Sequence, residues 1–294
     1  MGTRCAVEVW APDRMAGEDA INAVFDDMRR IDQLMSTYKA TSEISKVNRE
    51  AAQHPVRISA ELFSLLETAQ KYSELSNGVF DITYASVGYL FDYRKHLRPD
   101  TRAIDKALPT VDYRQLKLDP ASRTVSFGKP GMRIDLGGIA KGYAVDRGIG
   151  ILGRRGYTHA MVNSGGDTRV LGDRMGKPWM VGIRHPDRKD EVVLRIPLED
   201  AAFSTSGDYE RYFDEGGVRY HHIINPKTGD SPHEVRSVTL ISTSATRTDG
   251  LTKTVFILGP VAGMEFIDSL PDVDGIIIAA DGKVTYSKDL QPPE

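Results

Sequence analysis

The sequence predicts an α+β fold, because helical and strand patterns are intermingled along the chain without a regular βαβ repeat. Two segments, 17–35 and 59–75, carry apolar residues at i, i+3 and i+4 spacing, which is the period of an amphipathic helix. Short apolar or alternating runs bounded by glycine, proline or aspartate indicate strands over much of the remainder. We therefore expect mixed sheets with packed helices. The 294 residues form one domain or two closely packed subdomains.

In chain order, the first half begins with an alternating strand over 5–10, followed by the helix over 17–35. Ser42 and Glu43 have the pattern of a helix cap, and Asn77-Gly78 is typical of a left-handed helix end. The segment 78–90 has no clean period, and 94–109 reads as a charged connector. Two strands are predicted on either side of the turn Asp119-Pro120.

The stretch RIDLGGIAKGYAVD, residues 133–146, is the central one. Residues 132–136 are apolar enough for a short buried strand, and a helix follows the paired glycines and ends near 153–156. Such a turn leaves backbone N–H groups at a helix N-terminus, where phosphate binds well. Lys141 would add a positive charge, and Asp135 could hold a loop or a metal. The alternative is a tight turn with a solvated lysine.

The second half reads as a series of strands that end in polar turns, with a late helix over 248–258. The predicted strand segments are 159–162, 179–186, 192–198, 201–209, 219–229, 235–243 and 275–287. Small residues beside one charged or aromatic group characterise their loops, as in ligand-binding loops. Any one of these loops alone is adequately explained as a turn.

Composition narrows the function classes. Hydrophobic residues make up 40% and charged residues 27%, as in ordinary globular proteins. A net charge of -3 gives no reason to expect nucleic acid or a membrane surface as partner. No run approaches the roughly 18 apolar residues of a membrane span. Charged residues interrupt the first thirty positions, so we expect a cytosolic protein or a form whose leader was removed. The single Cys5 cannot form an intrachain disulfide.

Several motifs in order resemble the ApbE family of bacterial FAD:protein FMN transferases: MGT, MSTY, SEISKVN, GVFDIT, IDLGGIAKGYAVD, NSGGD, HHIINPKTG and DG…VFILG. The resemblance implies an ApbE-like, T-fold-like α+β architecture with the FAD site in a cleft between subdomains. It also implies the reaction. Members cleave the pyrophosphate of FAD, pass FMN to a threonine or serine hydroxyl of a partner protein and release AMP, with a divalent ion, usually Mg²⁺.

The resemblance assigns catalytic roles to two residues. His222, in HHIINPKTG, corresponds to a histidine close to the reacting phosphates, where an imidazole can take the proton of the acceptor hydroxyl. Without the motif it would read as a surface histidine; His221 would point to the opposite side of an extended segment. Asp249 corresponds to the metal-binding aspartate, and Gly138 to a residue whose main-chain oxygen binds the same ion.

The resemblance also predicts cofactor-binding residues. Tyr38 matches an aromatic residue that stacks on the flavin, with a half-buried surface tyrosine as the alternative. Asp81 could instead cap a helix, and Arg184 could be a solvated edge charge. The other predicted FAD-binding positions are Met1, Ser42, Glu43, Thr83, Lys141, Asn163, Gly165, Gly166, Asp167, Ile183 and Ser206.

One position departs from the family. Members usually carry threonine or serine four residues after the aspartate, as a further metal ligand, and this chain has Lys253 there. A protonated lysine has three donors and no acceptor, so it cannot coordinate a cation. Its ammonium could take the place of the metal beside Asp249. Alternatively it could swing outward and leave Thr252 or Thr254 to help. The departure puts the Mg²⁺ in doubt.

The predicted function is therefore transfer of FMN from FAD to a partner flavoprotein, that is, protein flavinylation. The alternatives are a non-catalytic FAD-binding or carrier protein and an FAD pyrophosphatase that yields FMN and AMP. By resemblance, the acceptor is a flavoprotein subunit of a bacterial membrane redox complex. This places the chain in the periplasm, although no signal peptide precedes it in the sequence.

Overall fold

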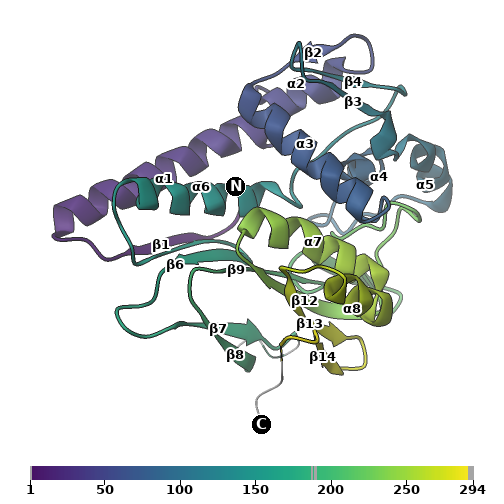
Figure 1. Cartoon of the computed structure of the whole chain (residues 1–294). Coiled ribbons are helices and arrows are strands. Elements are labelled where there is room, and N and C mark those ends of the chain that lie inside the picture. The colour runs from purple at the N-terminus through teal and green to yellow at the C-terminus, as the bar shows by residue number, and fades with distance from the viewer. Residues whose placement is uncertain (1, 187, 189–190, 291–294) are drawn as a thin grey trace. The chain divides into compact units, whose positions relative to one another are not determined.

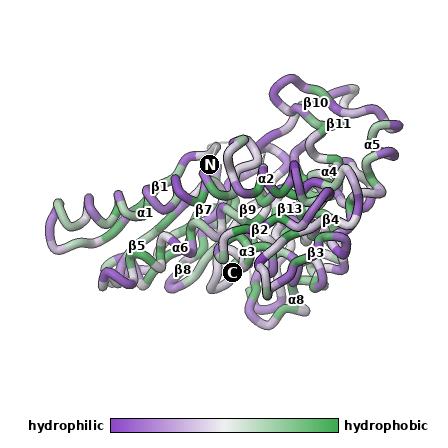
Figure 2. Tube along the Cα trace, turned by 90° about the horizontal axis from the view of Figure 1, so that it is seen from above, coloured by the Kyte–Doolittle hydropathy of each residue, from purple (hydrophilic) through white to green (hydrophobic). Residues whose placement is uncertain are grey.

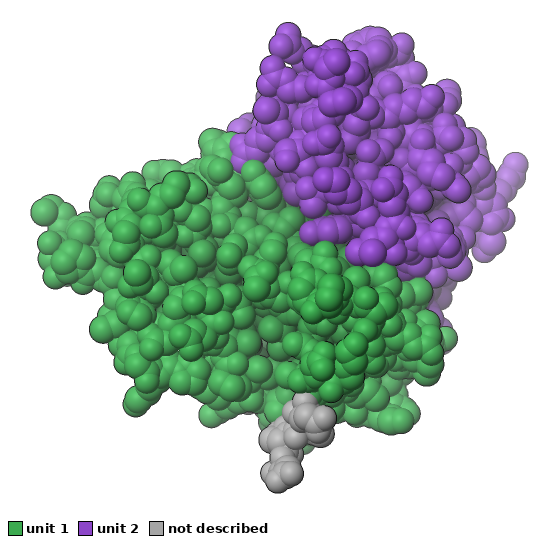
Figure 3. All heavy atoms as spheres, viewed as in Figure 1, with its two compact units in different colours: residues 1–31, 139–207, 234–294 green, residues 32–138, 208–233 purple. Residues whose placement is uncertain are grey.

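The computed structural model describes residues 2–186, 188 and 191–290. The chain divides into two compact units, coloured separately in Figure 3. Unit 1 comprises Met1–Ile31, Ile139–Gly207 and Glu234–Glu294, and unit 2 comprises Asp32–Gly138 and Asp208–His233. Helices and sheets occur in both units, and every strand pair among the described residues is antiparallel. The predicted α+β class is confirmed.

Unit 1 is built on a seven-stranded sheet in the order β1-β5-β6-β9-β12-β13-β14 (Figure 1). In Figure 2 the trace is green through β13, where Ile276, Ile277 and Ile278 are buried. The strands are β1 (Cys5–Val9), β5 (Ala160–Ser164), β6 (Asp167–Leu171), β9 (Ala202–Gly207), β12 (Val235–Ser242), β13 (Asp274–Ala279) and β14 (Val284–Tyr286).

Helices cover one face of this sheet and a two-stranded hairpin packs on the other (Figure 1). The hairpin, β7 (Trp179–Arg184) and β8 (Val192–Leu198), buries an apolar cluster with Val170 and Ile276 of the sheet. No helix in the described part of the chain is long and apolar enough to cross a membrane. The helices are α1 (Arg14–Met35), α6 (Ala140–Arg154), α7 (Ala245–Leu258) and α8 (Pro260–Asp268).

The first turns of α6 and α7 lie against each other, and each is capped by a carboxylate of the other helix. Asp249 of α7 accepts the backbone N–H of Gly142 at 3.0 Å. Asp146 of α6 accepts the N–H groups of Ala245 and Thr246, both at 2.9 Å. Helix N-termini carry unsatisfied donors and partial positive charge. This reciprocal capping therefore lets two N-termini meet.

Unit 2 contains α2 (Glu43–Glu50), α3 (Ala60–Leu75), the short α4 (Ala85–Gly88) and α5 (Thr101–Ala107), a small sheet and a hairpin. The sheet has the order β2-β4-β3. Its strands and the hairpin strands are β2 (Val56–Arg57), β3 (Leu116–Asp119), β4 (Thr124–Phe127), β10 (Tyr212–Glu215) and β11 (Val218–His221). Three single-turn 3₁₀ helices complete the unit: η1 (Ile82–Tyr84), η2 (Leu108–Thr110) and η3 (Tyr113–Gln115).

The local signals in unit 2 predicted its helix ends well. Ser42 caps α2 by accepting the N–H of Ser45 at 3.1 Å, as predicted. Asn77 and Gly78 follow α3 with φ of 50° and 78°, which confirms the left-handed helix end. The strands beside Asp119 are also confirmed. The connector over 94–109 was an incomplete prediction, because it contains α5, capped by Asp100.

The predicted strand over 132–136 is wrong. Met132, Ile134 and Leu136 are buried, but the backbone of the segment is bound by side chains and, at the N–H of Asp135, by the carbonyl of Ile82 at 3.0 Å. Asn48 donates to the carbonyl of Ile134 at 2.9 Å and accepts its N–H at 2.8 Å. Ser86 accepts the N–H of Arg133 at 2.9 Å. The apolar pattern correctly predicted that alternate side chains of the segment are buried. The hydrogen-bond partners of its backbone come from distant positions in the sequence, which no local pattern reveals.

His221, the last residue of β11, closes the loop that follows this strand as a buried, neutral imidazole. Its Nε2 donates to the carbonyl of Pro232 at 2.7 Å, and its Nδ1 accepts the N–H of Ile223 at 3.3 Å. Burial lowers the pKa of His221 to about 4. The side chain thus fixes both ends of the loop that follows β11, and it does so only while it is uncharged.

The close approach of α6 and α7 requires glycine at position 142. A Cβ there would lie 2.1 Å from the carbonyl oxygen of Ala245 and 2.7 Å from Cβ of Asp249. We predict that Gly142→Ala lowers the free energy of unfolding by about 1–3 kcal/mol, because overpacking must separate the helices. Gly153→Ala is the control, since nothing lies within 4 Å of its Cβ and alanine favours a helix. Equal denaturation midpoints for the two variants would contradict this packing.

The neutral state of His221 makes unit 2 sensitive to acid. The folded pKa lies below the unfolded value near 6.5, so this group's contribution to stability is complete above pH 6.5 and is lost as the pH falls towards 4. At pH 5 the loss is about 2 kcal/mol. His221→Gln keeps the donor and cannot protonate, so its unfolding free energy should change less between pH 7.5 and 5. The exposed His54→Gln is the control; a pH dependence in His221→Gln matching that of the unsubstituted protein would refute the assignment.

Candidate functional site

Two lysines and two aspartates meet in unit 1, brought together by α6, β6 and α7. Lys141 donates to Asp167 at 2.6 Å and to Asp249 Oδ1 at 3.0 Å. Lys253 donates to the same Oδ1 and, at 2.8 Å, to the backbone carbonyl of Asp249. We call these four residues the charge cluster. Lys253 therefore points towards Asp249, which is the first of the two orientations considered from the sequence.

The aspartates of the charge cluster are more deeply buried than its lysines. The side chains of Asp249 and Asp167 are 0% and 2% exposed, whereas those of Lys141 and Lys253 are 28% and 18% exposed. A ligand approaching from solvent therefore meets the lysine side chains before it meets the carboxylates. This arrangement favours an anion, and the nearby N-terminus of α6 adds to the positive potential.

The pKa directions show what holds the charge cluster together. Burial opposes the charge of Asp249, but Lys141 and Lys253 outweigh it and lower its pKa to about 2. Burial also opposes the charge of Lys141, yet Asp167 and Asp249 raise its pKa. Asp167 differs, because burial together with the charge of Asp249 raises its pKa. Burial lowers the pKa of Lys253 in spite of its contact with Asp249. Each buried charge thus depends on its partners.

A ladder of hydroxyl groups sets the rotation of α7 against β9. Thr248 bonds Ser204 at 2.8 Å, and Thr252 accepts from Ser206 at 2.9 Å. These threonines are four residues apart on the helix, and the serines two apart on the strand, so each set lies on one face. The ladder fixes the same turns of α7 that carry Asp249 and Lys253. Ser206, predicted to bind FAD, forms this contact while 6% exposed.

The NSGGD turn joins β5 to β6 and places Asp167. Asn163 donates to Thr168 at 2.7 Å and to the carbonyl of Gly165 at 3.1 Å. Gly165 has φ of 65°, and a Cβ on Gly166 would lie 2.5 Å from the carbonyl oxygen of Thr205. Both glycines are therefore required by the fold itself. Their role in cofactor binding, with that of Asn163, stays a prediction.

The expected row of free N–H groups at the start of α6 is only partly present. The N–H of Gly142 is bound by Asp249, as described above. In unit 2, Asp135 accepts the N–H of Gly137 at 2.6 Å and the hydroxyl of Thr37 at 2.7 Å. Asp135 thus holds a loop, one of the two roles considered for it. Gly138 is the last residue of the first segment of unit 2, and its role as a main-chain metal ligand stays a prediction.

Predicted site residues of unit 2 fall into exposed and structural groups. Tyr38 is 88% exposed, so its ring is open to a partner and is not half-buried. Ser42 donates to the carbonyl of Ser36 at 2.7 Å in addition to capping α2. Glu43 accepts both the N–H and the hydroxyl of Ser59 at 2.9 Å, which links the starts of α2 and α3.

Asp81 and Thr83 form a buried structural pair in unit 2. Asp81 caps η1 by accepting the N–H and hydroxyl of Thr83 at 2.8 and 2.6 Å, and it also accepts the N–H of Tyr113 at 2.9 Å. Burial raises the pKa of Asp81 to about 6 despite these bonds. The helix-cap alternative considered for Asp81 is therefore realised. Binding of FAD by these two residues stays a prediction.

The remaining predicted residues are not members of the charge cluster: His222 belongs to unit 2, and Ile183 and Arg184 belong to β7 of unit 1. His222 directly follows β11, is half-buried, and donates its N–H to the carbonyl of Arg211 at 3.1 Å. The side chain of Ile183 is 2% exposed within the apolar cluster under β7 and β8. Arg184 is exposed at the end of β7. Met1 lies outside the described residues.

The oxygens around Asp249 do not fit a divalent metal ion. Oδ1 accepts from both lysines, Oδ2 accepts from Gly142, and the hydroxyl of Thr252 bonds Ser206 and the carbonyl of Asp249. Mg²⁺ needs near-octahedral oxygen ligands at about 2.0–2.1 Å. A doubly charged ion 4 Å from one ammonium would be repelled by about 8 kcal/mol at an effective dielectric constant of 20.

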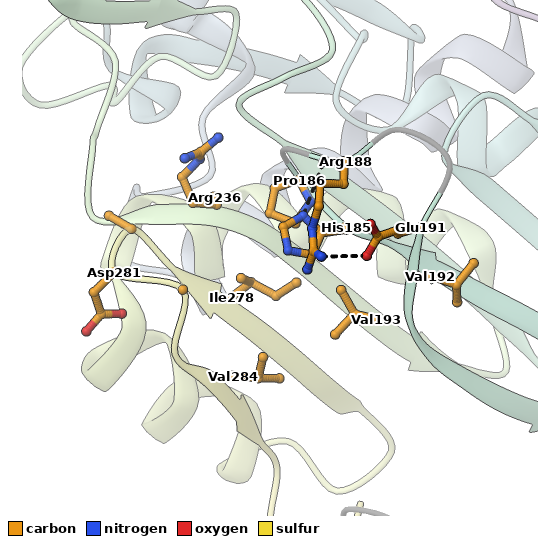
Figure 4. A pocket seen from close by; sticks show the side chains of 12 residues that line it. His185, Pro186, Arg188, Glu191, Val192, Val193, Arg236, Ile278, Asp281 and Val284 are labelled. Atoms are coloured by element: carbon orange, nitrogen blue, oxygen red, sulfur yellow. Dashed lines mark hydrogen bonds and ion pairs between the residues drawn. The ribbon is translucent and has the colours of Figure 1, made fainter.

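A cavity of about 570 Å³ opens elsewhere on unit 1 (Figure 4). Arg188 and Glu191 form an ion pair at 2.7 Å at its rim. None of the residues that line it belongs to the charge cluster or to the predicted site. The volume of this cavity therefore does not identify it as the FAD site. Its polar lining includes His185, Arg188, Glu191, Arg236 and Asp281.

Comparison with known proteins agrees with the motifs. The profile of the ApbE family matches residues 1–277. A "FAD:protein FMN transferase" of Treponema pallidum is 33% identical over 98% of this chain and 84% of its own length. A protein of the same name from Klebsiella pneumoniae is 29% identical over 98% of this chain and 89% of its own.

Solved structures have the same fold. The ApbE protein of Thermotoga maritima superposes with a TM-score of 0.90 at 34% identity, covering 98% of this chain and 94% of that one. The flavin transferase ApbE of Vibrio cholerae gives a TM-score of 0.87 at 28% identity over the same shares. Fold, motif order and near-complete coverage agree, and the chain belongs to the ApbE family.

Proposed function

We propose that this chain transfers the FMN moiety of FAD to a threonine or serine hydroxyl of a partner flavoprotein and releases AMP. The observation that carries the proposal is the charge cluster of an ApbE-family chain, with its lysines facing solvent and its aspartates buried. FAD contains a pyrophosphate, and a pair of neighbouring ammonium groups suits that anion. The relatives' shared name supports FAD as the substrate.

In the proposed reaction the acceptor hydroxyl oxygen bonds to the phosphorus of the FMN half, and the bond to the bridging oxygen breaks. AMP leaves with the electron pair. His222 takes the proton of the hydroxyl, for which a neutral imidazole is suited. Lys141 and Lys253 offset the negative charge on the phosphates, and such preorganised charge is a large source of catalysis. The exposed ring of Tyr38 offers a face for the flavin.

Two other functions remain as alternatives. A carrier would bind FAD without cleaving it, and the poor fit of a metal ion beside Asp249 is the observation that favours it. A pyrophosphatase would use water in place of the hydroxyl and yield FMN and AMP. The transferase, the carrier and the pyrophosphatase would all bind the pyrophosphate through the same lysines. The reaction products therefore distinguish the three functions, whereas the binding site does not.

The setting of the reaction is also a proposal. We propose a flavoprotein subunit of a membrane redox complex as the acceptor, at the periplasmic face of a bacterial inner membrane. The resemblance to the ApbE family supports this setting. A protein acceptor is implied by the name that the relatives carry.

Incubation with FAD and an acceptor tests the proposed function. The protein is incubated with FAD and a threonine-bearing acceptor peptide, and products are followed by mass spectrometry and by AMP release. We expect one FMN on the peptide for each AMP released. The matched peptide with alanine in place of threonine should remain unmodified. AMP without a flavinylated peptide would identify a pyrophosphatase, and bound FAD without AMP a carrier.

His222→Ala should retain FAD binding and lose transfer. Removal of a general base costs on the order of 10²–10⁴-fold in rate. The single-turnover rate and the FAD dissociation constant are measured separately, so that a binding defect is not mistaken for lost chemistry. His233→Ala is the matched control, because His233 is an exposed histidine at the other end of the same loop. A rate within twofold of the control would leave His222 with a structural role only.

A further inference from the structure

The charge cluster also indicates which cation neutralises the charge of the pyrophosphate. We propose that the ammonium of Lys253 is the fixed cation of this site, in the place where a divalent metal ion would bind Asp249. The identity of the anion rests on the proposed function. The choice of cation rests on contacts within unit 1.

The first argument is that the oxygens of Asp249 are already satisfied. Lys253 contacts both Oδ1 and the backbone carbonyl, Lys141 contacts Oδ1, and Gly142 contacts Oδ2. The hydroxyl of Thr252 is not a spare ligand, because it is held by Ser206 and by the carbonyl of Asp249. A metal ion would have to break several of these bonds together.

The second argument is the order in which a ligand from solvent meets the charges. Both carboxylates are at most 2% exposed, whereas the side chains of Lys141 and Lys253 are 28% and 18% exposed. A cation from solvent therefore has to pass the two positively charged lysine side chains before it reaches a carboxylate, whereas an anion is attracted by them. Asp249 and Asp167 anchor the lysines from inside and leave the outer side positive.

The third argument is donor capacity. An ammonium has three N–H donors. Lys141 uses two of them on Asp167 and Asp249, which leaves one for a ligand oxygen. Lys253 has its weakest contact with the hydroxyl of Thr252 at 3.3 Å, a bond that a phosphate oxygen can replace. The two lysines can thus bind one pyrophosphate as adjacent point charges.

Metal binding by the apoprotein tests the proposal without any activity measurement. Mn²⁺ is titrated into the protein and its Lys253→Thr variant, and free Mn²⁺ is followed by electron paramagnetic resonance. We expect Lys253→Thr to bind Mn²⁺ at least about tenfold more tightly, a difference of 1.4 kcal/mol. Lys283→Thr, at an exposed lysine between β13 and β14, controls for the loss of one positive charge. Equal Mn²⁺ affinity for Lys253→Thr and the unsubstituted protein would overturn the proposal.

Flavin affinity provides the second readout. In EDTA the unsubstituted protein should bind FAD as tightly as in Mg²⁺, whereas Lys253→Thr should lose affinity in EDTA and recover it in Mg²⁺. Lys253→Met removes the charge without adding an oxygen, so its loss should persist in both conditions. Loss of FAD from the unsubstituted protein in EDTA would contradict the proposal. If no variant binds FAD, the proposed function fails, and the Mn²⁺ titration still decides which cation occupies the site.

Discussion

The site in unit 1 depends on the reciprocal capping of α6 and α7. Two helix N-termini, each with unpaired donors and partial positive charge, are held against each other. They can meet because Asp249 binds the first turn of α6 and Asp146 binds the first turn of α7. Gly142 makes the contact sterically possible. Without this arrangement Lys141 and Lys253, which come from different helices, would not share one carboxylate.

The capping role gives Asp249 two functions that cannot be separated by deleting its side chain. It is a helix cap through Oδ2 and the anchor of two lysines through Oδ1. Replacement by alanine would leave the N–H of Gly142 and two buried ammonium groups with fewer partners, at a cost of several kcal/mol. Loss of activity in such a variant therefore reports stability as much as chemistry. Changes at Lys253 keep the cap and are more informative.

Local sequence signals predicted the parts of the fold that are locally determined. The cap at Ser42 and the left-handed pair after α3 depend on residues within one turn. The strand predicted over 132–136 is wrong, because residues far away in the sequence, among them Asn48, bind the backbone of this segment. α8 was missed, although proline at its first position is a known start signal.

The candidate site could be predicted as a set of residues but not as an arrangement. The motifs singled out Lys141, Asp167, Asp249 and Lys253, and the structure brings these four together. That both lysines would turn onto one oxygen, and that Asp146 would complete the helix pair, depends on contacts about a hundred residues apart. The hydrophobic periodicity of a sequence carries no information about such long-range contacts. Asp81 realises the helix-cap alternative that local reasoning offered, whereas the bonds of Glu43 to Ser59 were not predicted.

A crystal structure of the FAD complex grown in the presence of Mg²⁺ tests the central claim most directly. We predict pyrophosphate oxygens within hydrogen-bond distance, about 3 Å, of Nζ in both Lys141 and Lys253, with Oδ2 of Asp249 still on the N–H of Gly142. A divalent ion coordinated by Asp249, with Lys253 displaced from the carboxylate, would contradict it.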